Sequence, residues 1–180
     1  MAFVSLFMIA SLVGPGFAAN VHLKGGKNAE PSFFDNILTL TASGDLTGLG
    51  NEDVLVTLTA TANPTATCTN PAGEKQPPGK NPAPVTVTGS ESIPKEEIDN
   101  GNVHFSVTTN APVTPILGAP DCTNGQGAWT ESITDMAFTS AAITVEQPKG
   151  TTVLTVACTF SPQTVNGAVP ASSVSCSQSS

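Results

Sequence analysis

The sequence contains no arginine. Its charged side chains are six lysines against 14 acidic residues, which gives a formal net charge of −8. An excess of negative charge repels nucleic acid phosphates and anionic membrane surfaces. Arginine is also the residue that most often holds phosphate or carboxylate through paired hydrogen bonds. The composition therefore excludes a nucleic-acid-binding role and disfavours a site for phosphorylated ligands.

Charged residues of both signs are scarce, and tyrosine is absent. Charged residues make up 11% of the chain, whereas hydrophobic residues make up 39%. This balance fits neither a disordered polyelectrolyte nor a helical protein rich in surface charge. It favours strands with threonine-rich outer faces. The length of 180 residues fits one domain.

The first residues have the pattern of a secretory signal peptide, assigned to residues 1–18. An apolar run, Phe3–Val13, is followed by Gly14-Pro15 and small residues. The run is shorter than the about 20 residues that a membrane-spanning helix needs, so no stable membrane anchor is expected. Small residues at positions 16 and 18 predict cleavage after Ala18. The pattern predicts a secreted, periplasmic or cell-surface protein.

Four cysteines, Cys68, Cys122, Cys158 and Cys176, are even in number and widely spaced. In an exported chain this pattern indicates two disulfides. More than one pairing is open. We favour Cys68–Cys122 and Cys158–Cys176, because each would tie a strand end to a nearby irregular segment. A zinc site is disfavoured, since it would need paired Cys or His at short spacing.

Alternation of apolar and polar residues predicts most of the strands. Residues 19–35 are expected to form an extended lead-in to a domain at 36–180 with a polar C-terminal tail. The runs 36–43 and 53–62 are interpreted as a pair of neighbouring strands. Further strands are expected at 85–93, 102–110, 129–134, 136–147 and 150–160, with a single helical turn within 94–101.

Two segments rich in proline and glycine, 63–84 and 111–127, are predicted to be long loops. No segment shows a convincing helical period. The prediction is an all-β protein: a single immunoglobulin-like antiparallel β-sandwich with two long loops. A small barrel is the alternative.

Four stretches carry a resemblance to a known group of proteins. They run from Gly48 to Ala60, from Cys68 to Gly73, from Asn81 to Val87 and from Asn100 to Thr109. They are similar to a family of small exported microbial proteins whose function is uncharacterised. The resemblance implies a secreted β-rich domain and carries over no catalytic residue.

No catalytic residue is predicted. His22 and His104 are the only histidines, and no G-x-S-x-G motif occurs. Acidic residues cluster at Glu52-Asp53 and at Glu96, Glu97 and Asp99. Such clusters serve glycoside hydrolysis or calcium binding, and Glu96, Glu97 and Asp99 are the candidate calcium ligands. The simpler interpretation is that both clusters are solvated turn residues.

Trp129 and Phe105 are the candidate ligand contacts, because their rings could stack on a sugar. Each is also a normal core residue of a sandwich. The threonine-rich strand faces are either ordinary solvent-exposed surface or a polar sheet surface suited to adhesion or to strand addition by a partner. We therefore expect a non-enzymatic secreted or cell-surface binding or structural module, with an extracellular protein or carbohydrate as partner and no cofactor. The alternatives are a carbohydrate-active hydrolase using loop carboxylates and a fibre subunit completed by strand addition.

Overall fold

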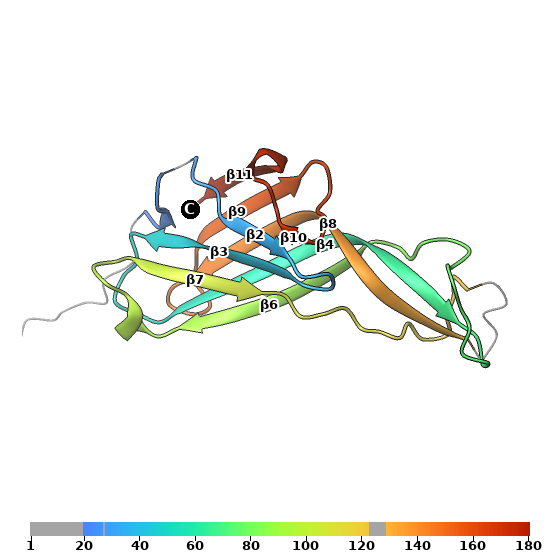
Figure 1. Cartoon of the computed structure of the whole chain (residues 1–180). Coiled ribbons are helices and arrows are strands. Elements are labelled where there is room, and N and C mark those ends of the chain that lie inside the picture. The colour runs from blue at the N-terminus through green and yellow to red at the C-terminus, as the bar shows by residue number, and fades with distance from the viewer. Residues whose placement is uncertain (1–19, 27, 123–128) are drawn as a thin grey trace, which may run out of the picture.

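The computed structural model describes residues 20–26, 28–122 and 129–180 of the chain. Two antiparallel sheets pack face to face around an apolar core (Figure 1), which confirms the predicted β-sandwich. Leu40 and Phe105 from one sheet and Leu58, Phe138 and Ile143 from the other are fully buried in that core. Residues 1–18, the expected signal peptide, lie outside the described residues.

The first sheet is built around one central strand. This strand is β3 (Leu40–Thr47). On one side it pairs with β1 (His22–Leu23) and β2 (Ser32–Asp35), and on the other side it pairs with β7 (Val103–Thr108). β10 (Gly167–Ala168) pairs with β2. The lead-in at 19–35 is therefore part of the sandwich. Its apolar residues Val21, Leu23 and Phe33 are buried in the core.

The second sheet contains the two longest strands. Its strands follow the order β11 (Val174–Ser179), β9 (Thr152–Phe160), β8 (Thr130–Glu146) and β4 (Val54–Thr69). The other side of β4 pairs with β6 (Val85–Ile93). β5 (Lys75–Gln76) pairs with the same side of β4 near its end. The predicted hairpin between residues 136–147 and 150–160 is confirmed by the pairing of β8 with β9.

The expected pairing of residues 36–43 with 53–62 is wrong. The parts of these runs that form strands, 40–43 and 54–62, lie in β3 and β4, which belong to different sheets. The chain crosses between the sheets through residues 48–53, which the buried amide of Gln147 holds in place. This amide accepts a hydrogen bond from Gly50 N at 2.7 Å and donates to the carbonyl oxygens of Gly50 at 3.1 Å and Glu52 at 2.6 Å. A sequence pattern does not reveal such a crossing, because both runs alternate in the same way.

The loop predicted to begin at residue 63 begins later, because β4 continues through Pro64 to Thr69. Likewise, the two segments expected at 129–134 and 136–147 form one strand, β8. Pro64 lacks a backbone donor and lies between two register shifts, each with an extra residue in β8. The two extra residues of β8 are Thr139 and Thr134. The Thr139 hydroxyl donates a hydrogen bond to the carbonyl of Thr61 at 3.2 Å, and the Thr134 hydroxyl donates one to the carbonyl of Thr65 at 3.3 Å. The bulges thus keep the ladder continuous, and its far half projects beyond the sandwich as a two-stranded ribbon (Figure 1).

Both favoured disulfides are present. Cys68–Cys122 ties the segment after β7 to the end of β4, with a Cα–Cα distance of 5.7 Å. Cys158–Cys176 links β9 to β11 across directly paired positions, with a Cα–Cα distance of 4.1 Å. The expected polar tail is therefore held in the second sheet as its edge strand.

Two short 3₁₀ turns connect strands. The turn predicted within 94–101 is η1 (Lys95–Glu97), and η2 (Ala171–Ser173) precedes β11. Within the described ranges, no helix is long and apolar enough to cross a membrane.

The backbones of the two sheets are in direct contact where β6 meets the end of β7. Asn110 N donates to Thr88 O at 3.1 Å. A Cβ atom built on Gly89 would lie 1.9 Å from the carbonyl oxygen of Thr108 and 2.8 Å from the Cα of Thr109. Only a residue without a side chain fits here, because the neighbouring atoms belong to backbone.

Replacing Gly89 with alanine is expected to lower the free energy of unfolding by at least about 3 kcal/mol, the upper end of the cost of overpacking. Urea denaturation followed by circular dichroism measures the change. Ser90→Ala, on the solvent side of the same strand, is the matched control and should stay within about 0.5 kcal/mol of the parent. A Gly89→Ala protein as stable as the parent would contradict the close approach of the two strands.

Candidate functional site

The outer face of the second sheet carries a regular array of small side chains. Because alternate strand residues point to opposite faces, and those facing inward are apolar and buried, the outward residues at the middle of β6, β4, β8, β9 and β11 form three successive rows. The next outward row, beyond the first, contains Leu55 and Glu146 and is not counted with them. We call these fifteen positions the hydroxyl face. In strand order, the first row is Ser90, Thr57, Thr144, Thr155 and Ser179, the second is Thr88, Thr59, Ala142, Ala157 and Ser177, and the third is Thr86, Thr61, Ser140, Thr159 and Ser175.

Every position of the hydroxyl face is serine or threonine except Ala142 and Ala157. The face has no charged, aromatic or large apolar side chain. Two threonine pairs in it are within hydrogen-bonding distance across strands: Thr59 and Thr88 at 3.3 Å, and Thr61 and Thr86 at 3.2 Å between hydroxyl oxygens. These contacts fix the positions of hydroxyls that would otherwise rotate freely.

A shallow hollow of about 510 Å³ lies on the hydroxyl face. It runs across β4, β8, β9 and β11, over the second and third rows. Its lining includes Ala142 and Ala157, which are direct neighbours across β8 and β9 and have the smallest side chains of the face, and Ala141 and Cys158 between the two rows. The hollow therefore exists because two methyl groups stand among longer side chains.

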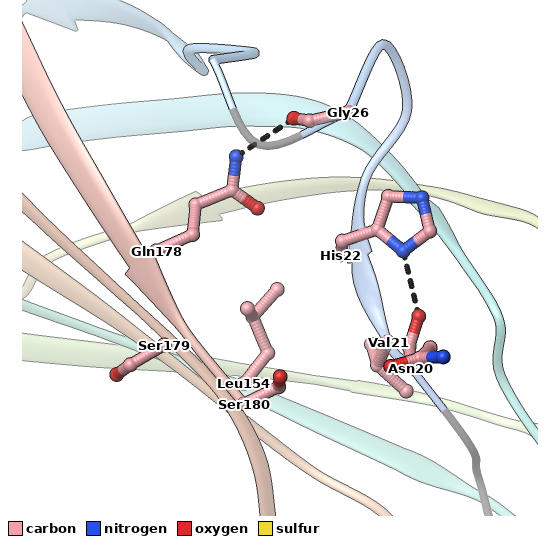
Figure 2. A pocket seen from close by; sticks show the side chains of 8 residues that line it. All are labelled: Asn20, Val21, His22, Gly26, Leu154, Gln178, Ser179 and Ser180. Atoms are coloured by element: carbon pink, nitrogen blue, oxygen red, sulfur yellow. Dashed lines mark hydrogen bonds between the residues drawn. The ribbon is translucent and has the colours of Figure 1, made fainter.

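A second hollow, of about 590 Å³, lies between β1 and the end of β11 (Figure 2). Val21 and Leu154 line it with apolar atoms. Two of its polar side chains are bonded to the chain itself: Gln178 Nε2 donates to Gly26 O at 3.1 Å, and His22 Nδ1 lies 2.6 Å from Asn20 O. We interpret this hollow as the junction that fixes the lead-in to the sandwich.

A third hollow, of about 490 Å³, lies between β6 and the proline-containing segment after β7. Val85, Val87, Ile116 and Ile133 give it apolar walls. None of the three hollows is lined by Asp or Glu.

The candidate calcium ligands Glu96, Glu97 and Asp99 are exposed on η1 and the turn that follows it. Asp99 Oδ1 accepts a hydrogen bond from the side chain of Asn100 at 2.9 Å. Within the described part of the chain, no group of three or more His, Cys, Asp or Glu side chains is placed to hold a metal ion. The three acids are therefore not gathered into a shared site.

The acidic pair Glu52-Asp53 has a structural environment. Asp53 Oδ1 accepts the backbone N–H of Lys95 at 2.9 Å and so holds the start of η1. The carbonyl oxygen of Glu52 accepts the Gln147 amide. These contacts explain the acids as turn residues.

The two aromatic candidates lie in different parts of the molecule. Phe105 is fully buried, because alternate residues of β7 face the core, and its ring is not available to a surface ligand. Trp129 is half-buried directly before β8 and packs against Cys68, Ala119 and Cys122. The two rings do not form a common platform.

His104 is exposed, as alternation with the inward residues of β7 predicts. Its Nδ1 lies 3.0 Å from Asp45 Oδ1 on the neighbouring strand β3. This pair gives the outer face of the first sheet charged character that the hydroxyl face lacks.

A buried acid that the sequence pattern did not reveal joins the two sheets. Asp35, at the end of β2, accepts hydrogen bonds from the Thr164 hydroxyl and from Ile37 N at 3.0 Å. The Thr164 hydroxyl oxygen in turn accepts a hydrogen bond from Phe138 N of β8 at 2.9 Å. Burial raises the pKa of the Asp35 carboxyl above its ordinary value, the hydrogen bonds from Thr164 and Ile37 oppose this rise, and the nearby Asp135 carboxylate adds to it.

A second buried acid, Glu131, anchors the segment that Cys122 ties down. Its Oε2 accepts the backbone N–H of Asp121 at 3.3 Å, and its own carbonyl accepts Ile116 N at 2.7 Å. Lys80 lies 3.3 Å from the Asp121 carboxylate. These contacts hold the segment on the ribbon, and we assign Glu131 a structural role.

Comparison of the chain with protein-family models, with curated proteins and with solved structures found no match. The geometry of the chain itself is therefore the basis for inferring its function.

The raised pKa of Asp35 predicts a pH dependence of stability. The folded protein binds this proton more tightly than the unfolded chain, so the stability that the neutral carboxyl provides is present at low pH. It is lost as the pH rises through the raised pKa. Asp35→Asn stays neutral at every pH. We expect its stability relative to the parent to increase from acidic to neutral pH in urea denaturation.

Glu97→Gln, which removes an exposed acid, is the control and should show no such trend. A stability difference between Asp35→Asn and the parent that is constant with pH would contradict the assignment.

Proposed function

We propose that the chain is an exported, non-enzymatic binding module and that the hydroxyl face is its binding surface. The observation that carries the proposal is the uniform chemistry of this face across five strands. Soluble proteins usually intersperse charges of both signs over their surface. Here the chain has a net charge of −8, yet these fifteen contiguous positions include no charged residue.

The chemistry of the face favours an uncharged, extended ligand. Protein-binding surfaces are typically enriched at their centre in aromatic residues, methionine and arginine, which provide most of the binding energy. The hydroxyl face has none of these. It instead offers many hydroxyls, each both a donor and an acceptor, at regular spacing. Such a surface gains affinity from many weak contacts with a large ligand.

Export is supported by two features. Two disulfides, Cys68–Cys122 and Cys158–Cys176, are typical of oxidising compartments outside the cytoplasm. The N-terminal residues also have the composition of a secretory signal.

The alternative functions have less support. A hydrolase using two loop carboxylates would bring them to one hollow, and none of the three hollows is lined by an acid. A fibre subunit completed by strand addition would leave a side of the sandwich open. Described residues bridge both sides: Asn110 joins β7 to β6, and Gln178 and Glu30 join β11 to the lead-in.

Export can be tested by the intact mass of the protein recovered from the medium of producing cells. We expect a chain that begins at Ala19 and gains the mass of about two hydrogens per disulfide on reduction. A full-length chain with free thiols inside the cell would contradict export.

The binding surface can be tested by depletion of the protein from solution by insoluble matrices: cellulose, chitin and starch as uncharged polymers, and an anion exchanger as a charged one. We expect retention on at least one uncharged polymer that persists at high salt. Thr144→Lys places a charge on β8, the central strand of the hydroxyl face, and should weaken this retention at least about tenfold, or 1.4 kcal/mol.

His104→Lys adds the same charge to the outer face of the other sheet and should leave retention unchanged. Binding to the anion exchanger alone, or equal retention of the two variants, would contradict the hydroxyl face as the binding surface.

A further inference from the structure

We infer that the ligand of the hydroxyl face is a neutral polysaccharide whose chain lies across the strands, over Ala142 and Ala157. This inference rests on the proposed function, because it specifies the ligand of the same face. It is carried by the position, length and lining of the hollow on that face.

The hollow has the dimensions of a binding site for part of a polymer. Its volume of about 510 Å³ falls in the range of ligand sites, roughly 300–1,000 Å³. It crosses four strands, and neighbouring strands are about 4.8 Å apart, so it is about 14 Å long. This length accommodates a short run of sugar units rather than a single one.

The hollow reaches an edge of the sheet. Ser175 and Ser177 form its end on β11, which is the edge strand, whereas Thr59 and Thr61 form its other end on β4. A bound chain can therefore continue past β11 into solvent. An open end fits a polymer, whereas a closed pocket would fit a small sugar.

The lining matches the two kinds of surface that a sugar ring presents. The methyl groups of Ala142 and Ala157 form a small apolar floor suited to the C–H groups of a ring. Beside this floor stand the hydroxyls of Ser140, Thr159 and Ser175, which can exchange hydrogen bonds with sugar hydroxyls.

Charge distinguishes neutral from acidic polysaccharides. The lining contains no Lys and the chain contains no Arg, so nothing at the hollow compensates an anionic sugar. The net charge of −8 would repel a polyanion. The hollow also lacks an aromatic ring for stacking, so each sugar unit contributes little and affinity depends on many units bound together.

Affinity electrophoresis in native gels tests this inference. The gels contain soluble neutral polysaccharides, namely hydroxyethyl cellulose, glucomannan and mixed-linkage β-glucan, or polygalacturonate as the anionic control. We expect retardation by at least one neutral polymer and none by polygalacturonate. Ala157→Ile fills the hollow with an uncharged residue that suits a strand, and should raise the dissociation constant at least tenfold.

Ser106→Ile makes a comparable change at an exposed position of β7 in the first sheet, outside the hydroxyl face, and is the matched control that should bind like the parent. The double variant Thr159→Ala and Ser175→Ala removes hydroxyls without adding bulk and should also weaken binding. Thermal unfolding establishes that each variant is folded.

The outcomes separate the inference from the proposed function. If Ala157→Ile binds as the parent does while Thr144→Lys does not, the face binds but the hollow is not the site, and the inference fails. If retardation occurs in polygalacturonate instead, the ligand class is wrong. If neither the neutral gels nor the insoluble matrices retain the parent protein, the proposed function fails as well.

Discussion

The ladder between β4 and β8 is the constraint on which the rest of the structure depends. It runs from the pair Leu55–Glu146 to the pair Thr69–Thr130, and every other strand of the second sheet is placed relative to it. Its inward side chains, such as Leu58 and Ile143, form the centre of the core. The same alternation points Thr57 and Thr144 outward. The core and the hydroxyl face are therefore fixed by one register, because a slip of one residue would exchange them.

The scarcity of charge determines how the loops are attached to this framework. Where another protein would use arginine, this chain uses glutamine amides that bond to backbone groups. Gln147 holds the crossing between the sheets through three such hydrogen bonds. Gln178 accepts from Leu23 N at 3.0 Å and donates to Gly26 O at 3.1 Å and Ala29 O at 3.0 Å, so it ties the lead-in to the edge strand. An amide satisfies both donors and acceptors without the desolvation cost of a buried charge.

The sequence was sufficient for the fold class and most strands, because these depend on alternation. The favoured disulfides are present, but Cys158–Cys176 joins two paired strands and not a strand end and an irregular segment, so the reason for favouring it was wrong. The sequence was insufficient wherever partners are far apart in the chain. The crossing of residues 48–53 depends on Gln147, about a hundred residues later, and the passage of β4 through Pro64 depends on the bulges at Thr134 and Thr139. The hydroxyl face shows the same limit. Each strand carries a visible alternation of hydroxyl residues, but the rows exist only once five strands are in register.

Threonine on this face does not by itself indicate a ligand, because it is the polar residue with the best fit to a strand. Alanine is the informative residue. It is depleted in strands, yet Ala142 and Ala157 occupy directly paired outward positions on β8 and β9, two of the three inner strands. A threonine at either position would suit the strand better and would continue the rows. Positions that depart from a local preference without a structural gain are those where a function is expected to act. The paired alanines create the hollow, so the departure from strand preference and the proposed binding site coincide in the same two residues.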